Sequence, residues 1–277
     1  MNCAWKEFLA ILPLWCRTDV DELGRETLQE LRLRTGLVPE LIRSNGNIRL
    51  KRPVSADDLS YIVNTASRYS PWAATTMGQG YITAPGGHRI GICGQAVVHD
   101  GQMTGIRQIS SLCLRIARDF PGISSQLQYI SGSILLIGPP GSGKTTLLRD
   151  LIRQKSDTMK GSIGVVDERG ELFPPGFSCG FRTDILTGCP KEQGIDRLLR
   201  VMSPRIIAMD EVSSQKDARA LVRAGWCGVE LYATAHAASK TDLLARPVYA
   251  PLVHSGIFDM LVILQQDKSF KAERLGA

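Results

Sequence analysis

The chain has 277 residues, of which 43% are hydrophobic and 6% aromatic, and 33 lysines and arginines against 27 aspartates and glutamates give a formal net charge of +6. No apolar run reaches the ~18 residues of a membrane span, which excludes such a helix within these residues, and the length suits one large or two modest domains. The basic surplus weakly favours acidic partners such as nucleic acid, membrane surfaces or nucleotides, but an ordinary solvated surface explains it better because no long basic run occurs.

The first 70 residues are predicted to be mostly helical. The stretch "FLAILPLWC", from Phe8 to Cys16, has the length of a signal-peptide core, but Glu7 precedes it, Arg17 follows it, and no small-x-small cleavage site is present. We therefore expect an amphipathic helix there rather than an export signal.

A later helix is predicted in "ADDLSYIVNTAS", where apolar residues recur at helical spacing and Ser55 or Asp57 stands in position to cap the first turn. Between these helices, "LQELRLRTGLVPELI" alternates at Leu31 and Leu33 and turns at Gly36. That pattern is typical of a strand entering a hairpin.

From Gly78 to Arg118 the sequence changes to short apolar runs separated by Gly-Gly, Asp-Gly and Gly-Gln pairs, as in "GYITAPGGHRIGICGQAVVHDGQMTG", and "LCLRIAR" closes the segment. This pattern predicts an antiparallel meander. "DFPGISS" is interpreted as a linker, and from Ser133 onward strands alternate with helices, as in a parallel α/β sheet. We therefore predict an α/β protein with a smaller α+β N-terminal domain at 1–120, β-rich at 78–118, and an α/β domain at 121–277, the boundary lying between Arg118 and Gly122.

The stretch "ILLIGPPGSGKTTLLRDLI", residues 134–152, leads from a buried strand through glycines into a helical pattern. Its Gly-x-x-x-x-Gly-Lys-Thr spacing is that of a phosphate-binding loop, in which Lys144 reaches the β- and γ-phosphates and Thr145 offers its hydroxyl to Mg²⁺. Lys144 is therefore expected to be exposed to the ligand rather than packed. Glycines let backbone N–H groups surround anionic oxygens, and the following helix adds its positive end. A glycine turn with a surface lysine is the alternative. The predicted ATP-binding residues are Gly138, Pro139, Pro140, Gly141, Ser142, Gly143, Lys144, Thr145 and Thr146.

A second motif, "PRIIAMDEV", places Asp210 and Glu211 directly after four apolar residues. Acids at the carboxyl end of a core strand would lie beside the phosphate loop, where an open α/β sheet binds its ligand. We predict that Asp210 holds Mg²⁺ through water and that Glu211 is a catalytic residue orienting the attacking water. The alternative is a pair of acids in an ordinary turn.

Two more strands are predicted to end in polar or acidic residues that could take part in the reaction. "VELYATAH" ends at Thr234 and His236, placed to sense the γ-phosphate or the water, although a lone histidine is usually structural. "IGVVDERGEL" brings Asp167, Glu168 and Glu171 to a strand end. The convergence of several strand ends on one edge is a stronger indication of a hydrolytic site than any single motif.

The cysteines form no CxxC pair and their number is odd, which indicates neither a zinc site nor a disulfide framework. We expect reduced, metal-free thiols that behave as small hydrophobic residues. They are Cys3, Cys16, Cys93, Cys113, Cys179, Cys189 and Cys227.

The order of these motifs resembles the secretion ATPase superfamily of type II and type IV secretion and pilus motors. That superfamily has a phosphate loop, an Asp box (here "VVDERGEL"), a second acidic motif (here "LLRVMSPRIIAMDEV") and a His box (here "ATAH"). More closely, "GYITAPGGHRIGICG", "SSLCLRIAR", "FRTDILTGCPK" and "MSPRIIAMDE" are similar to the stage III sporulation protein AA family, in order and over nearly the whole chain.

The resemblance implies a RecA-like C-terminal ATPase domain that uses ATP and Mg²⁺, with Glu168 of the Asp box and His236 of the His box among its catalytic residues. It also implies a cytoplasmic, mother-cell ATPase of endospore-forming bacteria. Such a protein would form a homo-oligomeric ring, a hexamer by likeness to the superfamily, at the base of a channel between mother cell and forespore. Its partners would be membrane proteins of that channel, with peripheral membrane association through them, and no nucleic acid is expected.

One departure concerns the catalytic arginine. Secretion ATPases usually follow the catalytic Glu with Ile-Arg-Asp, whereas this chain has Val212, Ser213 and Ser214. We predict that Arg115 completes the site, from the same or a neighbouring subunit; its alternative role is a salt bridge on a sheet edge. Other arginines available in the β-rich segment are Arg89, Arg107 and Arg118. "DLLARPVYAPLV" is predicted to be a short connection.

Other functional classes fit less well. A nucleic-acid motor or loader would share the RecA-like core and suit the basic charge, but no basic stripe interleaved with aromatics and no helix-turn-helix pattern is found. Glu211 argues against a nucleotide-binding scaffold without turnover, and the Asp and His boxes argue against a small-molecule kinase. Salt-dependent binding to single strands would favour the motor, and membrane co-fractionation with channel proteins the secretion type.

Overall fold

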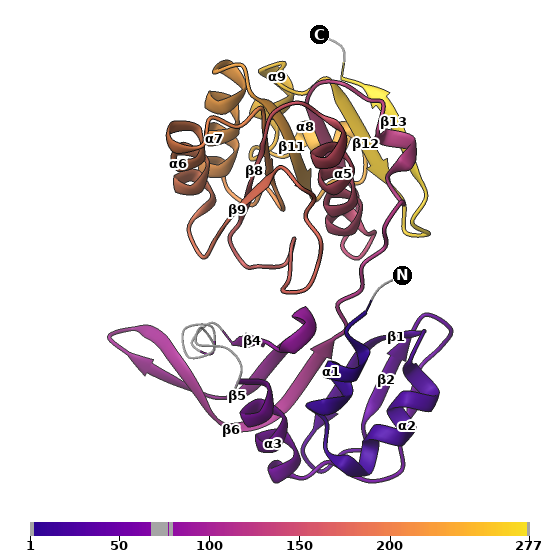
Figure 1. The fold of residues 1–277 in the computed structure, drawn as a ribbon. Coiled ribbons are helices and arrows are strands. Elements are labelled where there is room, and N and C mark those ends of the chain that lie inside the picture. The colour runs from indigo at the N-terminus through magenta and orange to yellow at the C-terminus, as the bar shows by residue number, and fades with distance from the viewer. Residues whose placement is uncertain (1–2, 68–76, 78–79, 276–277) are drawn as a thin grey trace. The chain divides into compact units, whose positions relative to one another are not determined.

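The computed structural model describes residues 3–67, 77 and 80–275, and the chain divides into two compact units (Figure 1). The first consists of Met1–Asp119 with Pro174–Gly176, and the second of Phe120–Phe173 with Phe177–Ala277. The start of the predicted meander at Gly78 lies outside the described residues. Within the described part, no helix is long and apolar enough to cross a membrane.

The first unit is built on a six-stranded sheet in the order β3-β2-β1-β6-β5-β4, with antiparallel pairing between neighbours. Alternate residues of β1, such as Leu31 and Leu33, are buried in a core to which the helices of this unit also contribute side chains. The strands are β1 (Leu28–Arg34), β2 (Glu40–Arg43), β3 (Ile48–Arg49), β4 (Tyr81–Thr83), β5 (Arg89–His99) and β6 (Gln102–Arg115), and the helices are α1 (Trp5–Ala10), α2 (Leu14–Gly24) and α3 (Ala56–Ser67).

The prediction that the first 70 residues are mostly helical is wrong in its proportion, because β1, β2 and β3 occupy the middle of the segment. The single helix expected around "FLAILPLWC" is two helices, since α1 ends at Ala10 and α2 begins after Pro13. Proline has no N–H to donate and is tolerated only at the start of a helix. The predicted hairpin is confirmed: β1 and β2 pair antiparallel across a turn in which Gly36 has φ 78°.

The helix predicted over residues 56–67 is confirmed as α3, and its four spaced apolar residues are buried. Ser55 rather than Asp57 caps it. The Ser55 hydroxyl accepts from the Asp58 backbone N–H at 3.1 Å, and the Asp58 carboxylate accepts in return from the Ser55 N–H at 2.9 Å. These two hydrogen bonds satisfy the backbone N–H groups of Ser55 and Asp58 at the start of the helix.

Strands β5 and β6 form a long hairpin (Figure 1), paired from Arg89↔Arg115 to His99↔Gln102. Asp100 and Gly101 at its tip have φ of 50° and 74°, the left-handed geometry that an Asp-Gly turn favours. The sequence predicted that the Gly94-Gln95 pair separates two strands, but the structure does not end a strand there. The pair lies at a bulge within β5, where a Cβ on Gly94 would come within 2.8 Å of the Arg107 carbonyl oxygen.

The second unit is built on a seven-stranded sheet in the order β13-β12-β7-β11-β10-β8-β9, in which the strands run parallel except β13. The strands are β7 (Ile134–Ile137), β8 (Ile163–Asp167), β9 (Thr183–Thr187), β10 (Ile206–Met209), β11 (Glu230–Ala235), β12 (Met260–Leu264) and β13 (Phe270–Arg274). The helices are α5 (Lys144–Thr158), α6 (Lys191–Val201), α7 (Gln215–Trp226), α8 (Lys240–Ala245) and α9 (Ala250–His254).

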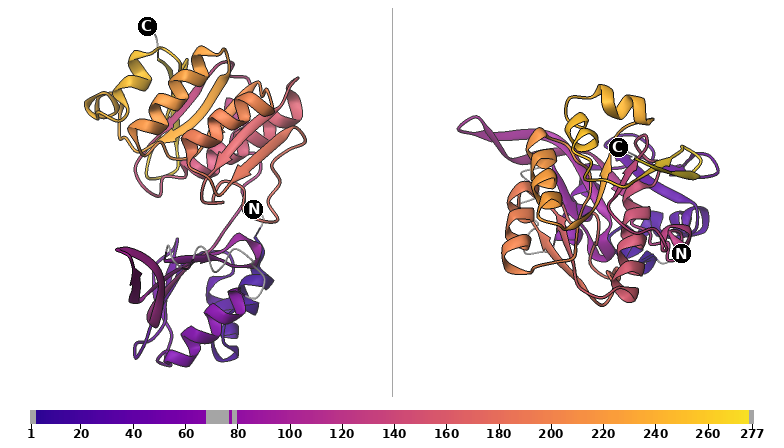
Figure 2. Two further views of the ribbon diagram at one scale, coloured as in Figure 1. Left: turned by 90° about the vertical axis from the view of Figure 1, so that its left-hand side faces the viewer. Right: turned by 90° about the horizontal axis from the view of Figure 1, so that it is seen from above.

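The two faces of this sheet bury separate cores (Figure 2). Ile134 and Leu136 of β7 pack with apolar residues of α5, whereas Leu135 and Ile137 pack with those of α6, α7 and α9. Successive residues of a strand point to opposite faces, so a run of four apolar residues needs cover on both sides. The central strands are therefore fixed in place, and so are the residues at their carboxyl ends.

The segment "DLLARPVYAPLV", predicted to be a short connection, contains most of two short helices, α8 and α9. The Ser239 hydroxyl caps α8 by accepting from the Asp242 backbone N–H at 3.1 Å. Leu243 and Leu252 from these helices are buried in the core shared with α7. These helices therefore help to cover one face of the sheet.

Candidate functional site

The loop between β7 and α5, residues 138–143, has the backbone that its glycines permit. Gly141 and Gly143 have φ of 74° and 96°, values that side chains rarely allow. A Cβ on Gly138 would lie 2.6 Å from the Ser142 hydroxyl and 2.8 Å from the Leu264 carbonyl oxygen, so no side chain fits there. The Ser142 hydroxyl is buried and has no hydrogen-bond partner within the described residues. An unsatisfied polar group in a glycine loop at a helix start fits an anionic ligand.

Lys144 is the first residue of α5, and its side chain is only 6% exposed. The sequence interpretation took it to be exposed to a ligand rather than packed, and this is corrected. Its Nζ donates to the carbonyl oxygens of Gly138 at 2.9 Å and Pro139 at 3.0 Å, and lies 3.1 Å from Nδ1 of His236. Burial lowers the pKa of Lys144, while the charges of Asp210 and Glu211 oppose that shift.

Asp210 follows β10 and lies against the helix that starts with Lys144. Its two carboxylate oxygens accept from the Thr145 hydroxyl at 2.7 Å and from the Thr234 hydroxyl at 2.6 Å. The structure thus brings together the two residues predicted to hold Mg²⁺, Thr145 and Asp210. A hydroxyl and a carboxylate are the oxygen ligands that Mg²⁺ prefers, so the donor set fits this ion.

Glu211 has φ 53°, a left-handed conformation uncommon for a residue other than glycine. It is held there by its N–H, which donates to the Thr234 hydroxyl at 2.8 Å, and by its carbonyl, which accepts from Lys191 Nζ at 2.7 Å. Its carboxylate lies 3.7 Å from Nε2 of His236 and is 44% exposed. Backbone strain of this kind is found at functional sites, where neighbouring bonds sustain it.

His236 follows β11 and lies between Lys144 and Glu211. Burial, and next the positive charge of Lys144, lower the pKa of His236. A neutral imidazole that accepts from Lys144 at Nδ1 carries its proton on Nε2, the nitrogen facing Glu211. His236 can therefore orient both the lysine and the glutamate.

Lys191 was not identified as a site residue from the sequence. Besides bonding the Glu211 carbonyl, its Nζ lies 3.6 Å from the Glu168 carboxylate. Lys191 therefore links Glu168, a predicted catalytic residue, to Glu211 by contacting the carboxylate of the first and the carbonyl of the second. The one available signal was the position of Lys191 directly after Pro190, at the first residue of α6.

Asp167 is the last residue of β8, at a strand end as predicted, and its carboxylate is bound by the backbone of the loop that follows. Its carboxylate accepts from the backbone N–H groups of Glu171 at 2.9 Å, Leu172 at 2.9 Å and Phe173 at 3.0 Å. Burial raises the pKa of Asp167, and these N–H donors act in the opposite direction. The residue organises its own loop, and Arg149 binds the carbonyls of Leu172 and Glu171 from the other side.

Arg115, the predicted catalytic arginine, is the last residue of β6 in the first unit and is 64% exposed. Its Nε lies 3.4 Å from the Glu30 carboxylate of the neighbouring strand β1. The other arginines considered have partners in the same unit: Arg89 stacks on Tyr81, Arg107 donates to Gln95, and Arg118 donates to the Arg25 carbonyl.

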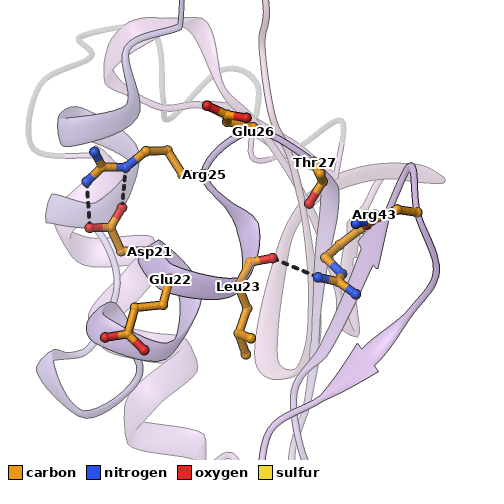
Figure 3. A pocket seen from close by; sticks show the side chains of 8 residues that line it. Asp21, Glu22, Leu23, Arg25, Glu26, Thr27 and Arg43 are labelled. Carbon is orange, nitrogen blue, oxygen red and sulfur yellow. Dashed lines mark hydrogen bonds and ion pairs between the residues drawn. The ribbon is translucent and has the colours of Figure 1, made fainter.

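A surface hollow of about 510 Å³ lies beside the end of α2, and three of the charged side chains that line it have partners there (Figure 3). Arg25 pairs with Asp21 at 2.7 Å, and Arg43 donates to the Leu23 carbonyl at 3.0 Å. No predicted site residue lines it. The seven cysteines are free thiols, and the described residues contain no cluster of three or more metal-ligating side chains.

Comparison with known proteins places the chain beside one sporulation family. The model of the family described as sporulation stage III, protein AA matches residues 8–273. The stage III sporulation protein AA of Bacillus subtilis (strain 168) is 34% identical over 280 residues, which cover 95% of this chain and 91% of that protein.

Solved structures of secretion and pilus ATPases are similar to this chain. The Legionella pneumophila ATPase DotB superposes with a TM-score of 0.58 and 17% identity, covering 95% of this chain and 80% of that one. The pilus retraction motor PilT with bound ADP gives a TM-score of 0.62 and 15% identity, covering 91% and 77%. At such low identity the likeness shows the fold alone, so the chain shares the mixed α/β fold of these proteins.

Proposed function

Because the chain belongs to the sporulation stage III protein AA family, we propose that it is a Mg²⁺-dependent ATPase that powers or gates a channel between mother cell and forespore. The observation that carries the ATPase proposal is one cluster at the carboxyl ends of β7, β10 and β11. There Lys144 and Glu211 both lie near His236, at 3.1 Å and 3.7 Å, Thr145 donates to Asp210 at 2.7 Å, and the Thr234 hydroxyl links the two groups by contacts of 2.6 Å to Asp210 and 2.8 Å to Glu211. Loop, metal-ligand pair, candidate base and orienting histidine are thus all present.

The proposed reaction is hydrolysis of the bond between the β- and γ-phosphates. The loop N–H groups and the Lys144 ammonium bind the phosphates, which requires Lys144 to exchange its carbonyl acceptors for phosphate oxygens. Glu211 orients a water and accepts its proton as the water oxygen bonds to the γ-phosphorus; the bond to the β-phosphate oxygen breaks, leaving ADP and phosphate. Mg²⁺, held by Thr145 and Asp210, would neutralise charge on the phosphates when bound.

The cellular part of the proposal places the chain in the mother-cell cytoplasm, at the membrane through proteins of the channel. It is supported by the family membership. We expect a tagged chain purified from sporulating cells to bring down integral membrane proteins, identified by mass spectrometry. Recovery instead of single-stranded nucleic acid, released by moderate salt, would contradict the channel role and favour a nucleic-acid motor.

We also propose that the active site is completed by assembly into a homo-oligomeric ring, a hexamer by resemblance. Ser213 and Ser214, which follow Val212 at the position where an arginine would be expected, are engaged in capping α7 through Asp217. An arginine finger contributes a factor of ~10³ or more to phosphoryl transfer. The proposed source is Arg115 of a neighbouring subunit.

Assembly predicts that the ATPase rate per mole of chain rises with protein concentration. The rate should be measured over a dilution series, alongside mass by light scattering with Mg²⁺ and a non-hydrolysable ATP analogue. Arg115→Ala should lower the plateau rate, whereas Arg32→Ala, which loses a 2.8 Å ion pair to the same Glu30, should not. A constant rate in a protein that stays monomeric would rule this mechanism out.

A further inference from the structure

The turn between β12 and β13, residues 265–269, lies against the phosphate loop. Strand β12 pairs in parallel with β7, the strand that leads into the loop. At the end of β12, the Leu264 carbonyl oxygen and Cβ would lie 2.8 Å and 3.1 Å from a Cβ built on Gly138. Backbone packing within one sheet therefore fixes the position of the turn relative to the loop.

The turn holds Lys268 in a left-handed conformation, with φ 73°. Its backbone is fixed by the bond from the Gln265 N–H to the Ser269 carbonyl at 2.8 Å and by the bond from the Lys268 N–H to the Gln265 carbonyl at 3.1 Å. The Asp267 carboxylate also accepts from the Ser269 hydroxyl at 2.6 Å. Glycine is the usual residue at such a φ, so a lysine in this strained conformation points to a functional role for its side chain.

The Lys268 side chain extends over the phosphate loop. Its Nζ donates to the Gly141 carbonyl, and its Cδ lies 3.7 Å from the position of a Cβ on Gly143. Within the described residues, no carboxylate forms an ion pair with Lys268. The ammonium thus has a neutral acceptor at the rim of a loop built for anions, and an anionic oxygen is the stronger acceptor.

We propose that Lys268 is a nucleotide-binding residue that gives the phosphates of ATP a second cation from the same chain, in addition to Lys144. For this, the side chain would rotate away from the Gly141 carbonyl and exchange that acceptor for a phosphate oxygen. The inference rests on the proposed ATPase function and adds to it a cation that the phosphate-loop pattern does not contain. The proposed role of Lys268 is in nucleotide binding, so it does not depend on the proposed catalytic role of Arg115.

The test compares Lys268→Met with Lys271→Met, which removes the same charge from an exposed position on β13 of the same hairpin. Affinities for ATP and for inorganic tripolyphosphate should be measured by calorimetry at several salt concentrations. Lys268→Met should weaken both about tenfold, the effect of one charged hydrogen bond, and make affinity less dependent on salt. Lys271→Met should bind like the parent chain.

A second variant separates binding from support of the loop. Lys268→Gly removes the conformational strain, so its Tm should equal or exceed that of the parent while its affinity falls as in Lys268→Met. Parent-like affinity in Lys268→Met, or an unchanged salt dependence, would overturn the inference and leave the ATPase proposal standing. A parent chain that binds neither ATP nor tripolyphosphate would overturn both.

Discussion

Replacing Glu211 with glutamine is expected to lower the rate of ATP hydrolysis about 10²–10⁴-fold, the usual contribution of a general base. ATP affinity should stay near that of the parent, because Lys144, Thr145 and Asp210 are untouched. The fold should also be retained, since glutamine keeps the backbone N–H and carbonyl bonds that hold Glu211, and the carboxylate it replaces is 44% exposed and lies 3.7 Å from His236 Nε2. Phosphate release at saturating ATP and binding of a fluorescent ATP analogue give the two quantities.

The matched control is Glu168→Gln. Both glutamates contact Lys191, but Glu168 contacts it with its carboxylate and Glu211 with its carbonyl. If Glu211 is the base, Glu168→Gln, although it changes another predicted catalytic residue, should lower the rate less than Glu211→Gln does. A parent rate in Glu211→Gln together with a large loss in Glu168→Gln would transfer the role of base to Glu168.

Much of the second unit could be predicted from the sequence because its strands are short apolar runs that end in polar residues. In a parallel sheet the carboxyl ends of neighbouring strands meet, which is why residues as distant as Thr145, Asp210 and His236 could be expected on one edge. The structure brings these three within one network of contacts. Their chemical roles remain predictions.

The sequence could not predict which way a strand-end carboxylate points. Asp167 and Asp210 both follow apolar runs, yet Asp167 turns to three N–H groups of its own loop and Asp210 turns to Thr145. The difference depends on where the following backbone needs acceptors, which no local pattern encodes. Lys191 and Lys268 escaped notice for a related reason, since each reaches the site only through the packing of its own helix or hairpin.

The short helices were missed because their periodic signal is too brief. Helices α8 and α9 span only Lys240–Ala245 and Ala250–His254, less than two turns each, and they are sustained by packing on the core. In the first 70 residues, Pro13 divided one apolar run into two helices, and the two-residue strand β3 carried too few alternating residues to be recognised.

Replacing Lys144 with methionine is expected to weaken ATP binding by at least about 100-fold, because the ammonium would make charged hydrogen bonds to two phosphates. Methionine keeps the length of the buried stem. The substitution removes donors from the Gly138 and Pro139 carbonyls, but it also removes an ammonium whose lowered pKa reflects the cost of burying its charge. These effects oppose each other, so the Tm should change little.

Lys155→Met provides the matched control for that experiment. Lys155 lies on the same helix α5, donates to the Ile130 carbonyl at 2.6 Å, and has a pKa that burial also lowers, but it stands at the opposite end from the phosphate loop. Loss from α5 of one lysine whose ammonium donates to a backbone carbonyl is thus common to both variants, although Lys144 is buried and Lys155 only partly so. Affinity and Tm should be measured on the same samples. If Lys144→Met binds ATP as tightly as Lys155→Met, the loop between β7 and α5 does not hold the nucleotide, and the proposed active site fails with it.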